Sequence, residues 1–383
     1  MKFNLQKSRH SDIITEQHTK KKKFDLRLPL AVKIIYMVAA VCIPLYAAFL
    51  LSTEFSDFFN RYISSFFRAV LAKLTGWIPF SLAEFALILI PLWVFLITRL
   101  IMRRYGETLK EMLSAIVCIF SVLAIVFSTF TLGFAPAYRG STLDKKLGLE
   151  QAEVSADELY DTAVILAELV SEESKKVVYG KDNFSVMPYS YSEMNDKLIA
   201  AYDTVCDKYD FVQRLDSNLK PVMLSEAMSY THITGVYTFF TGEANINVAF
   251  PDYTIPFTAA HELSHQRGIA RENEANFMAF LVCINSDDAY IRYCAYLNMY
   301  EYVLSALGSA DAELYISARY SVPLAVSNEL IAYSDFYDKY RDSAASEVSE
   351  TVNDTFLKLH GTEGTRSYGM VVDLAVAYFK TEK

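Results

Sequence analysis

Residues 255–276 read Ile-Pro-Phe-Thr-Ala-Ala-His-Glu-Leu-Ser-His-Gln-Arg-Gly-Ile-Ala-Arg-Glu-Asn-Glu-Ala-Asn, and this stretch decides how the chain is interpreted. Pro256 favours a helix start and Gly268 a helix end. The stretch therefore predicts one helix that carries His261 and His265, followed by a second helix that begins near Ala270. Two histidines four residues apart lie on one helix face, about one turn from each other.

This spacing of histidines suits a single bound cation. Both imidazoles of His261 and His265 can reach one zinc ion at the ~2.0–2.1 Å that zinc requires. Glu262 lies next to the metal-bound water, whose pKa zinc lowers toward ~7, and its carboxylate can accept the proton as the water attacks a carbonyl. The alternative is a chance pattern of structural histidines, which has a probability on the order of 1% in a chain with so few histidines.

A catalytic zinc ion needs a third protein ligand. Glu272 and Glu274 are the two acidic candidates on the second helix. Glu272 is preferred because Asn276 follows it by one turn, where a polar side chain can hold a ligating imidazole by its second nitrogen. Glu274 remains the alternative third ligand.

Three apolar segments, at about 30–52, 79–100 and 112–135, are long enough to cross a bilayer. Because charge is nearly absent within each segment, three transmembrane helices are favoured over three buried helices of a soluble protein. Lysine and arginine are concentrated before the first segment and between the second and third. Loops rich in these residues stay in the cytoplasm.

The chain is therefore predicted to have three parts. Residues 1–29 form a basic cytoplasmic N-terminus, 30–138 a membrane domain and 139–383 an extracytoplasmic domain. Within the membrane domain, aromatic and aliphatic residues recur at helical spacing over about 55–75. This pattern is typical of an amphipathic helix in the membrane interface, and packing against the spanning helices or the outer domain is an equal alternative.

The domain after residue 139 is predicted to be mainly α, with a small antiparallel sheet. Helical periodicity marks the segments 157–174, 192–210, 286–306, 326–341 and 367–380. Residues 243–250 alternate polar and apolar side chains, which predicts a short half-buried strand that could pair with an extended peptide. The net charge of −9 argues against general nucleic-acid binding.

The site resembles that of the gluzincin metallopeptidases, which pair His-Glu-x-x-His with a glutamate on a following helix. The run Glu272-Asn-Glu-Ala-Asn276 is similar to the Glu-x-x-Ala-Asp of membrane CAAX prenyl proteases and the Glu-x-x-Cys-Asp of BlaR/MecR-type sensor peptidases. Asparagine at 276 departs from the aspartate of both families.

The whole layout resembles the bacterial domain-of-unknown-function 3810 family. The resemblance rests on the three N-terminal segments, the aromatic amphipathic stretch, HELSHQRGIARENEANF and a late Arg366-Ser-Tyr-Gly-Met-Val-Val-Asp-Leu. It implies a multi-pass protein of the bacterial cell membrane with a gluzincin-like, zincin-like outer domain.

These patterns together predict a membrane-anchored zinc metallopeptidase that hydrolyses extracytoplasmic proteins or peptides. His261, His265 and Glu272 are expected to bind Zn2+, with Glu262 as general base.

Tyr368 is a candidate hydrogen-bond donor to the developing oxyanion, although the chain has 26 tyrosines and ordinary packing is an alternative. His232 and His360 are further candidates near the site. A membrane sensor-transducer with a zincin-like domain is the alternative function, and the oligomeric state is left open.

Overall fold

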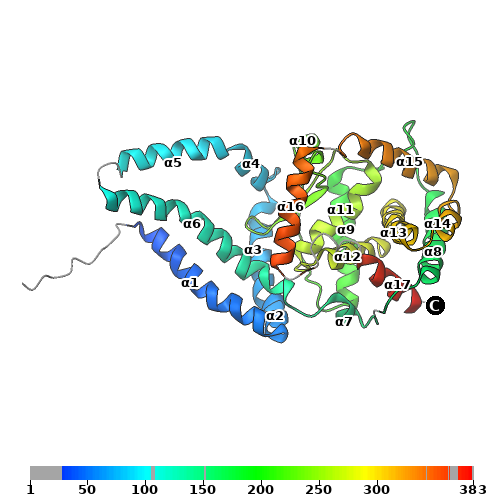
Figure 1. Cartoon of the computed structure of the whole chain (residues 1–383), viewed down its shortest axis with the longest axis horizontal. Helices are drawn as coiled ribbons and strands as arrows, with labels where there is room; N and C mark the ends of the chain where they lie inside the picture. Colours follow the sequence, from blue (N-terminus) through cyan, green and yellow to red (C-terminus); the bar gives the residue numbers. More distant parts are fainter. Residues whose placement is uncertain are drawn as a thin grey trace, which may run out of the picture.

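The computed structural model of the chain describes residues 28–104, 108–150, 152–341, 343–360, 362 and 370–381. Long helices project from one side of a rounded, mainly helical body (Figure 1). The projecting part and its base contain α1 (Leu30–Leu51), α2 (Thr53–Phe59), the π-helix η1 (Asn60–Ser64), α3 (Ser65–Gly76), α4 (Leu82–Ile88), α5 (Ile90–Arg104) and α6 (Leu109–Gly133).

The C-terminal body begins after α6 and contains the remaining elements. In chain order these are η2 (Ala135–Tyr138), α7 (Leu143–Leu147), α8 (Ala156–Ser174), α9 (Tyr191–Lys208), β1 (Leu219–Pro221), α10 (Ser225–Ser229), β2 (Gly235–Thr238), β3 (Glu243–Ile246), η3 (Asp252–Thr254), α11 (Ile255–Gln266), α12 (Glu272–Ile284), α13 (Ala289–Ala310), α14 (Ala312–Arg319), α15 (Leu324–Asp338), α16 (Ala344–Leu359) and α17 (Val371–Thr381). The predicted helices correspond to α8, α9, α13, α15 and α17.

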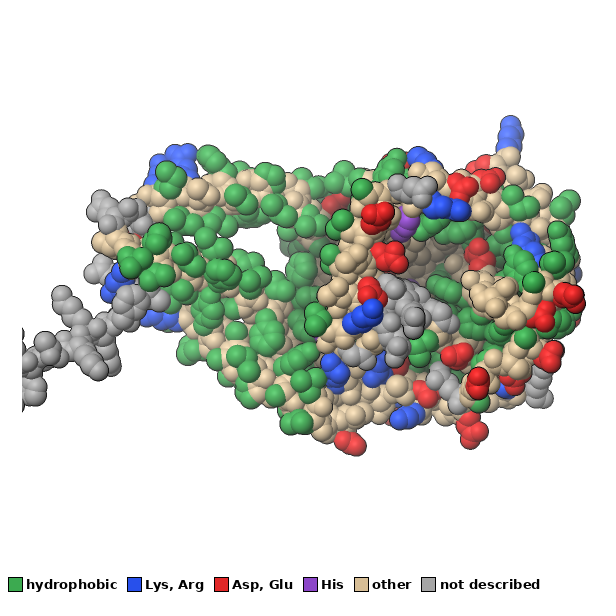
Figure 2. Space-filling view, viewed as in Figure 1, with side chains coloured by type: hydrophobic (Ala, Val, Ile, Leu, Met, Phe, Trp, Pro, Cys, Tyr) green, Lys and Arg blue, Asp and Glu red, His purple; other side chains and the backbone are tan. Residues whose placement is uncertain are grey.

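Two of the projecting helices, α1 and α6, are long and apolar enough to cross a membrane, and they pack side by side (Figure 1). The third predicted span, at 79–100, is not one straight helix. It consists of α4 and α5, which meet at Leu89 with a bend of 62°. The described residues therefore contain two candidate spans, or three if α4 and α5 together form a broken one. Figure 2 shows that hydrophobic side chains cover most of the projecting helices, with Lys and Arg at their far end.

The break coincides with Pro91, the second residue of α5, which lacks the amide that would continue the hydrogen bonds of α4. The body holds the start of α4. The first two backbone amides of α4 donate hydrogen bonds of 3.0 and 3.2 Å to the Glu243 carboxylate on β3. Glu84 in turn accepts hydrogen bonds of 2.9 and 2.7 Å from the backbone amides of residues 223 and 224. Both carboxylates are buried, so these bonds compensate the loss of their hydration. The body therefore sets the direction of α4, while α5 lies in the projecting part (Figure 1).

The amphipathic stretch predicted at about 55–75 forms a continuous helical run through α2, η1 and α3, here called the base helix (Thr53–Gly76). Its exposed face carries the apolar residues Phe58, Tyr62, Phe66 and Leu74, each more than half exposed. Its buried face carries the polar residues Ser56, Ser64, Arg68 and Thr75. Phe59 and Ala72 are buried beside these polar residues, and Arg61 and Lys73 are exposed beside the apolar ones. The helix thus leaves several large apolar side chains open, as a helix at a membrane surface would.

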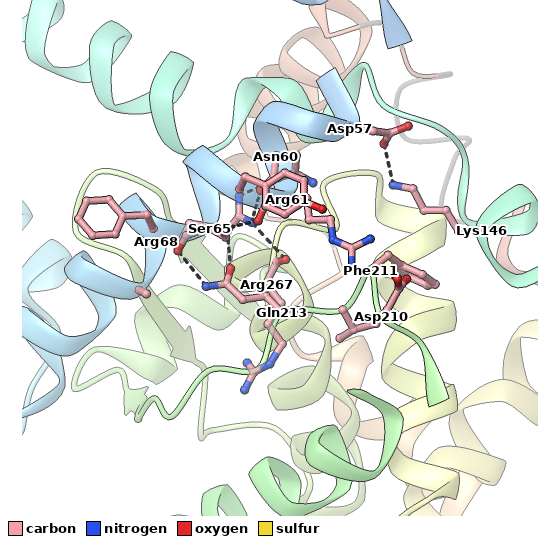
Figure 3. Close-up of a pocket in the computed structure, with 14 residues that line it drawn as sticks. Asp57, Asn60, Arg61, Ser65, Arg68, Lys146, Asp210, Phe211, Gln213 and Arg267 are labelled. Atoms are coloured by element: carbon pink, nitrogen blue, oxygen red, sulfur yellow. Dashed lines mark hydrogen bonds and ion pairs between the residues drawn. The ribbon is translucent and has the colours of Figure 1, made fainter. Parts of the chain in front are cut away.

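Arg68 joins the base helix to both α6 and the body. Its guanidinium donates to Asn60 Oδ1 at 2.8 Å and to the carbonyl oxygen of Gly133, at the end of α6, at 2.9 Å. It also donates to Gln213 Oε1 at 3.2 Å and to the carbonyl oxygen of Arg267 at 3.4 Å (Figure 3). Burial lowers the pKa of this guanidinium to about 10, so it remains charged at neutral pH.

The small sheet has the strand order β1-β3-β2, and it is mixed where an antiparallel sheet was predicted. β2 and β3 form an antiparallel hairpin, while β1 and β3 run parallel. The parallel pair arises because the chain passes through α10 after β1 before it forms the hairpin.

The prediction of a half-buried strand over 243–250 is wrong in extent and exposure. β3 ends at Ile246, and all four of its residues are buried. The alternating polar residues do not face solvent, because Glu243 binds the start of α4 and Asn245 donates to the carbonyl oxygen of Val236 at 3.0 Å. Since β1 and β3 pair on one side and β2 and β3 on the other, β3 cannot pair with a peptide. Among the described strands the edges of the sheet are β1 and β2.

Candidate functional site

The two histidines lie on α11, which packs against the sheet and against α12. Pro256 occupies the first turn of α11, as predicted. Gly268 ends the helical run with φ +87°, a conformation that glycine adopts without strain. The Ile269 amide then donates to the Ser264 carbonyl oxygen at 3.1 Å, which closes the helix end. A Cβ at Gly268 would lie 2.5 Å from Arg68 Nη2, so the tight turn also allows the base helix to approach.

This turn brings the start of α12 back to the histidines. Glu272 Oε2 lies 3.2 Å from His261 Nε2 and 3.6 Å from His265 Nε2. The three potential ligand atoms all lie within 4.8 Å of one another. The structure therefore brings together the two predicted histidines and Glu272, the third ligand that the sequence analysis preferred over Glu274.

The other nitrogen of each imidazole has its own partner. His261 Nδ1 lies 2.7 Å from Asn276 Oδ1, where the sequence predicted such a contact. His265 Nδ1 donates to the carbonyl oxygen of Ile269 at 2.8 Å. With the proton on Nδ1, each neutral imidazole turns the lone pair of Nε2 toward Glu272. The two Nε2 lone pairs and the Glu272 carboxylate repel one another unless a positive charge lies between them. These three potential ligands therefore fit a divalent cation.

The electrostatics of the group agree with this geometry. Burial works to lower the pKa of His265, but the Glu272 carboxylate outweighs it and raises the pKa to about 9. Burial would raise the pKa of Glu272, but His265 and His261 hold that pKa below its usual range. The negative field that favours a proton on His265 also attracts a cation.

Glu262 lies beside this group on α11 and is 4% exposed. Its Oε2 atom has no hydrogen-bond partner within the described part of the chain. Burial raises the pKa of Glu262, and the two histidines offset part of that shift, as does a hydrogen bond from the Tyr237 backbone amide on β2. A buried carboxylate oxygen without a partner is costly in a folded protein and is typical of a site that binds something.

The alternative ligand, Glu274, points elsewhere. Its carboxylate accepts a hydrogen bond of 3.0 Å from the Leu143 amide and pairs with Arg271 Nη1 at 2.8 Å. Glu274 thus holds α7 to the start of α12 and is absent from the converging group.

Two further predicted site residues, His232 and His360, are not part of this group. Tyr368 lies outside the described residues. His232 Nε2 lies 2.7 Å from the Tyr340 carbonyl oxygen, and His360 Nδ1 lies 2.7 Å from the Phe356 carbonyl oxygen.

Three features of the site escaped prediction from sequence. Gly235, on β2, lies so close to Glu262 that a Cβ there would be 2.6 Å from Glu262 Oε1. The ring of Phe134, which follows α6, lies edge-on to His265 with centroids 6.0 Å apart. The Ile269 carbonyl oxygen holds His265. No local signal marks these residues, because two are distant in sequence and the third acts through its backbone.

A family model described as a protein of unknown function, DUF3810, matches residues 55–376. The chain belongs to this family. The matched range begins in the base helix and ends in α17, so it includes α6, the sheet and both helices of the candidate site. No curated protein and no solved structure matches this DUF3810 chain.

Proposed function

We propose that this DUF3810 protein is a membrane-anchored, zinc-dependent peptidase. The observation that supports the proposal is the convergence of His261, His265 and Glu272 beside the buried, unpartnered oxygen of Glu262. Two imidazoles and one carboxylate are a common protein ligand set for hydrolytic zinc, which keeps a further position open for water.

Each residue has a role that follows from its contacts. His261, His265 and Glu272 would hold the metal, and Asn276 and the Ile269 carbonyl oxygen would orient the imidazoles. Bound zinc would supply a polarised carbonyl and an acidified water. Glu262 would take the proton of that water and pass it to the leaving amine. Tyr368 remains a proposed oxyanion donor.

The strand β2 supports a peptide as the substrate. It is an edge strand, it lies against Glu262, and its Tyr237 amide reaches the Glu262 carboxylate. An extended peptide can add to such an edge through main-chain hydrogen bonds, which position it without requiring a particular sequence. The substrate strand is therefore placed at β2 in this proposal, in place of the 243–250 segment.

The proposal is tested by Glu262→Gln in the full-length protein. We expect the variant to bind one zinc ion per chain, as the native protein does, and to lose cleavage. New N-termini in extracytoplasmic peptides should be compared between cells with the native protein and cells with the variant. If the two sets are identical, or if purified native protein contains no stoichiometric zinc, the peptidase proposal is wrong.

A sensor-transducer is the second candidate, because hydrogen bonds join the base helix to the end of α11. Asn60 Nδ2 donates to the Gly268 carbonyl oxygen at 3.0 Å, and Arg68 reaches the Arg267 carbonyl oxygen. A cellular phenotype that survives Glu262→Gln but is lost on Asn60→Leu would favour transduction over cleavage.

A further inference from the structure

A pocket of about 570 Å³ lies between the base helix and the body, apart from the candidate metal site. Figure 3 shows side chains of the base helix on one wall and the segment 210–213 on the other. The charged residues that line it are Asp57, Arg61, Arg68, Lys146, Asp210 and Arg267. Four cations and two carboxylates give these walls a surplus of positive charge, although the chain as a whole carries −9.

The surplus comes from two buried arginines. Arg68 and Arg267 are each 2% exposed. Within the described ranges, the hydrogen bonds that Arg68 and Arg267 donate go to neutral oxygens, and neither arginine has a carboxylate at ion-pair distance. A buried charge without a counter-ion is only weakly screened by solvent. The guanidinium of Arg267 is held inside the body over the Tyr202 ring, 3.9 Å from its centroid, so Arg68 is the buried cation that gives the pocket its attraction for an anion.

Two further cations stand at the open side. Arg61 pairs with Asp210 at 2.9 Å, with side chains 42% and 81% exposed. Such exposed pairs are weak, so Arg61 can turn to a ligand at little cost. Lys146 lies 3.2 Å from Asp57, whose carboxylate also accepts hydrogen bonds from the amide and hydroxyl of Ser141. Asp57 therefore keeps partners if Lys146 moves toward a ligand.

The pocket opens beside an apolar surface. Tyr62 and Phe66 line it and are 59% and 63% exposed on the open face of the base helix. A ligand with a negatively charged head and an apolar tail would match this arrangement. Phosphate groups are bound well by arginine and lysine through charge-assisted hydrogen bonds.

We propose that this pocket binds the phosphate of a phospholipid headgroup, with Arg61 and Lys146 contacting the phosphate and an acyl chain along Tyr62 and Phe66. The bound lipid would attach the base helix to the membrane surface. This inference does not depend on the peptidase proposal, since none of its residues belongs to the metal site.

Native mass spectrometry of the full-length protein in nonionic detergent tests the proposal. The protein is titrated separately with dioleoyl phosphatidylglycerol, with dioleoylglycerol, which lacks the phosphate, and with inorganic phosphate. We expect one phosphatidylglycerol to bind per chain, with neither of the other two probes retained. Binding should weaken as salt concentration rises.

Variants locate the site. Arg61→Gln with Lys146→Gln should weaken phosphatidylglycerol binding about tenfold or more, because charge-assisted contacts are lost. Arg214→Gln is the matched control, since Arg214 is also an exposed cation paired with carboxylates but does not line the pocket. Thermal melting of each variant checks the fold. The proposal is overturned if inorganic phosphate binds as tightly as the lipid, if dioleoylglycerol binds equally well, or if the double variant binds like the control.

Discussion

Gly235→Ala should disable Glu262 without touching a metal ligand. Gly235 lies on the edge strand β2, and its φ is not in the left-handed region, so alanine is compatible with the backbone. The added Cβ would lie 2.6 Å from Glu262 Oε1, 2.7 Å from its Cγ and 2.9 Å from its Cδ. Because three atoms of one buried side chain meet the methyl group, Glu262 must move as a whole.

The size of the effect follows from these distances. An ordinary contact begins at 3.4 Å, so the carboxylate must retreat by roughly 0.8 Å or β2 must shift by that amount. A misplacement of about 1 Å in a catalytic group costs on the order of 10²-fold in rate. We therefore expect kcat to fall about 100-fold, equivalent to ~2.7 kcal/mol. Overpacking should also lower the free energy of unfolding by about 1–3 kcal/mol.

The assay uses the full-length protein and a peptide whose cleavage disappears in Glu262→Gln. Zinc content, melting temperature and kcat are measured together. Gly76→Ala is the matched control, since its Cβ would meet Asn218 Nδ2 at an ordinary 3.8 Å. If the Gly235→Ala protein retains zinc and cleaves at the native rate, although the new Cβ must displace Glu262, the assignment of Glu262 as the general base is refuted.

Three further predictions concern the metal site and the core. Asn276→Leu removes the acceptor of His261 Nδ1 and should weaken zinc binding about 10- to 100-fold, measured by competition with a chromophoric chelator; unchanged affinity would contradict the orienting role. Stripping zinc with a chelator should lower the melting temperature of the native protein and zinc should restore it, whereas identical melting curves would exclude a bound metal. Burial raises the pKa of Glu301 from 4.5 to about 8, so this carboxyl stays protonated to a higher pH in the folded state than in the unfolded state. The free energy of unfolding therefore declines as the pH rises between these two pKa values. The melting temperature of Glu301→Gln, relative to that of the native protein, should therefore rise between pH 5 and pH 8. A difference that stays constant with pH would disprove the raised pKa of Glu301.

Local sequence determined much of the candidate site and the helical character of the fold. His261, Glu262 and His265 are placed by the 3.6-residue period of one helix, which Pro256 and Gly268 bound. The same local rules predicted the apolar helices α1 and α6 and the helices of the body. These features depend on residues one to four positions apart, so they can be derived without knowing the fold.

The tertiary structure decided features that depend on residues far apart in the chain. Glu272, and not Glu274, faces the histidines because Arg271 and the Leu143 amide hold the Glu274 carboxylate. The position of the start of α4 is fixed by hydrogen bonds with Glu243, about 160 residues away. Gly235 reaches Glu262 only because β2 packs on α11. The spacing of residues along the sequence does not reveal such contacts. Burial and hydrogen bonding between residues far apart in the chain arise only when the elements pack together.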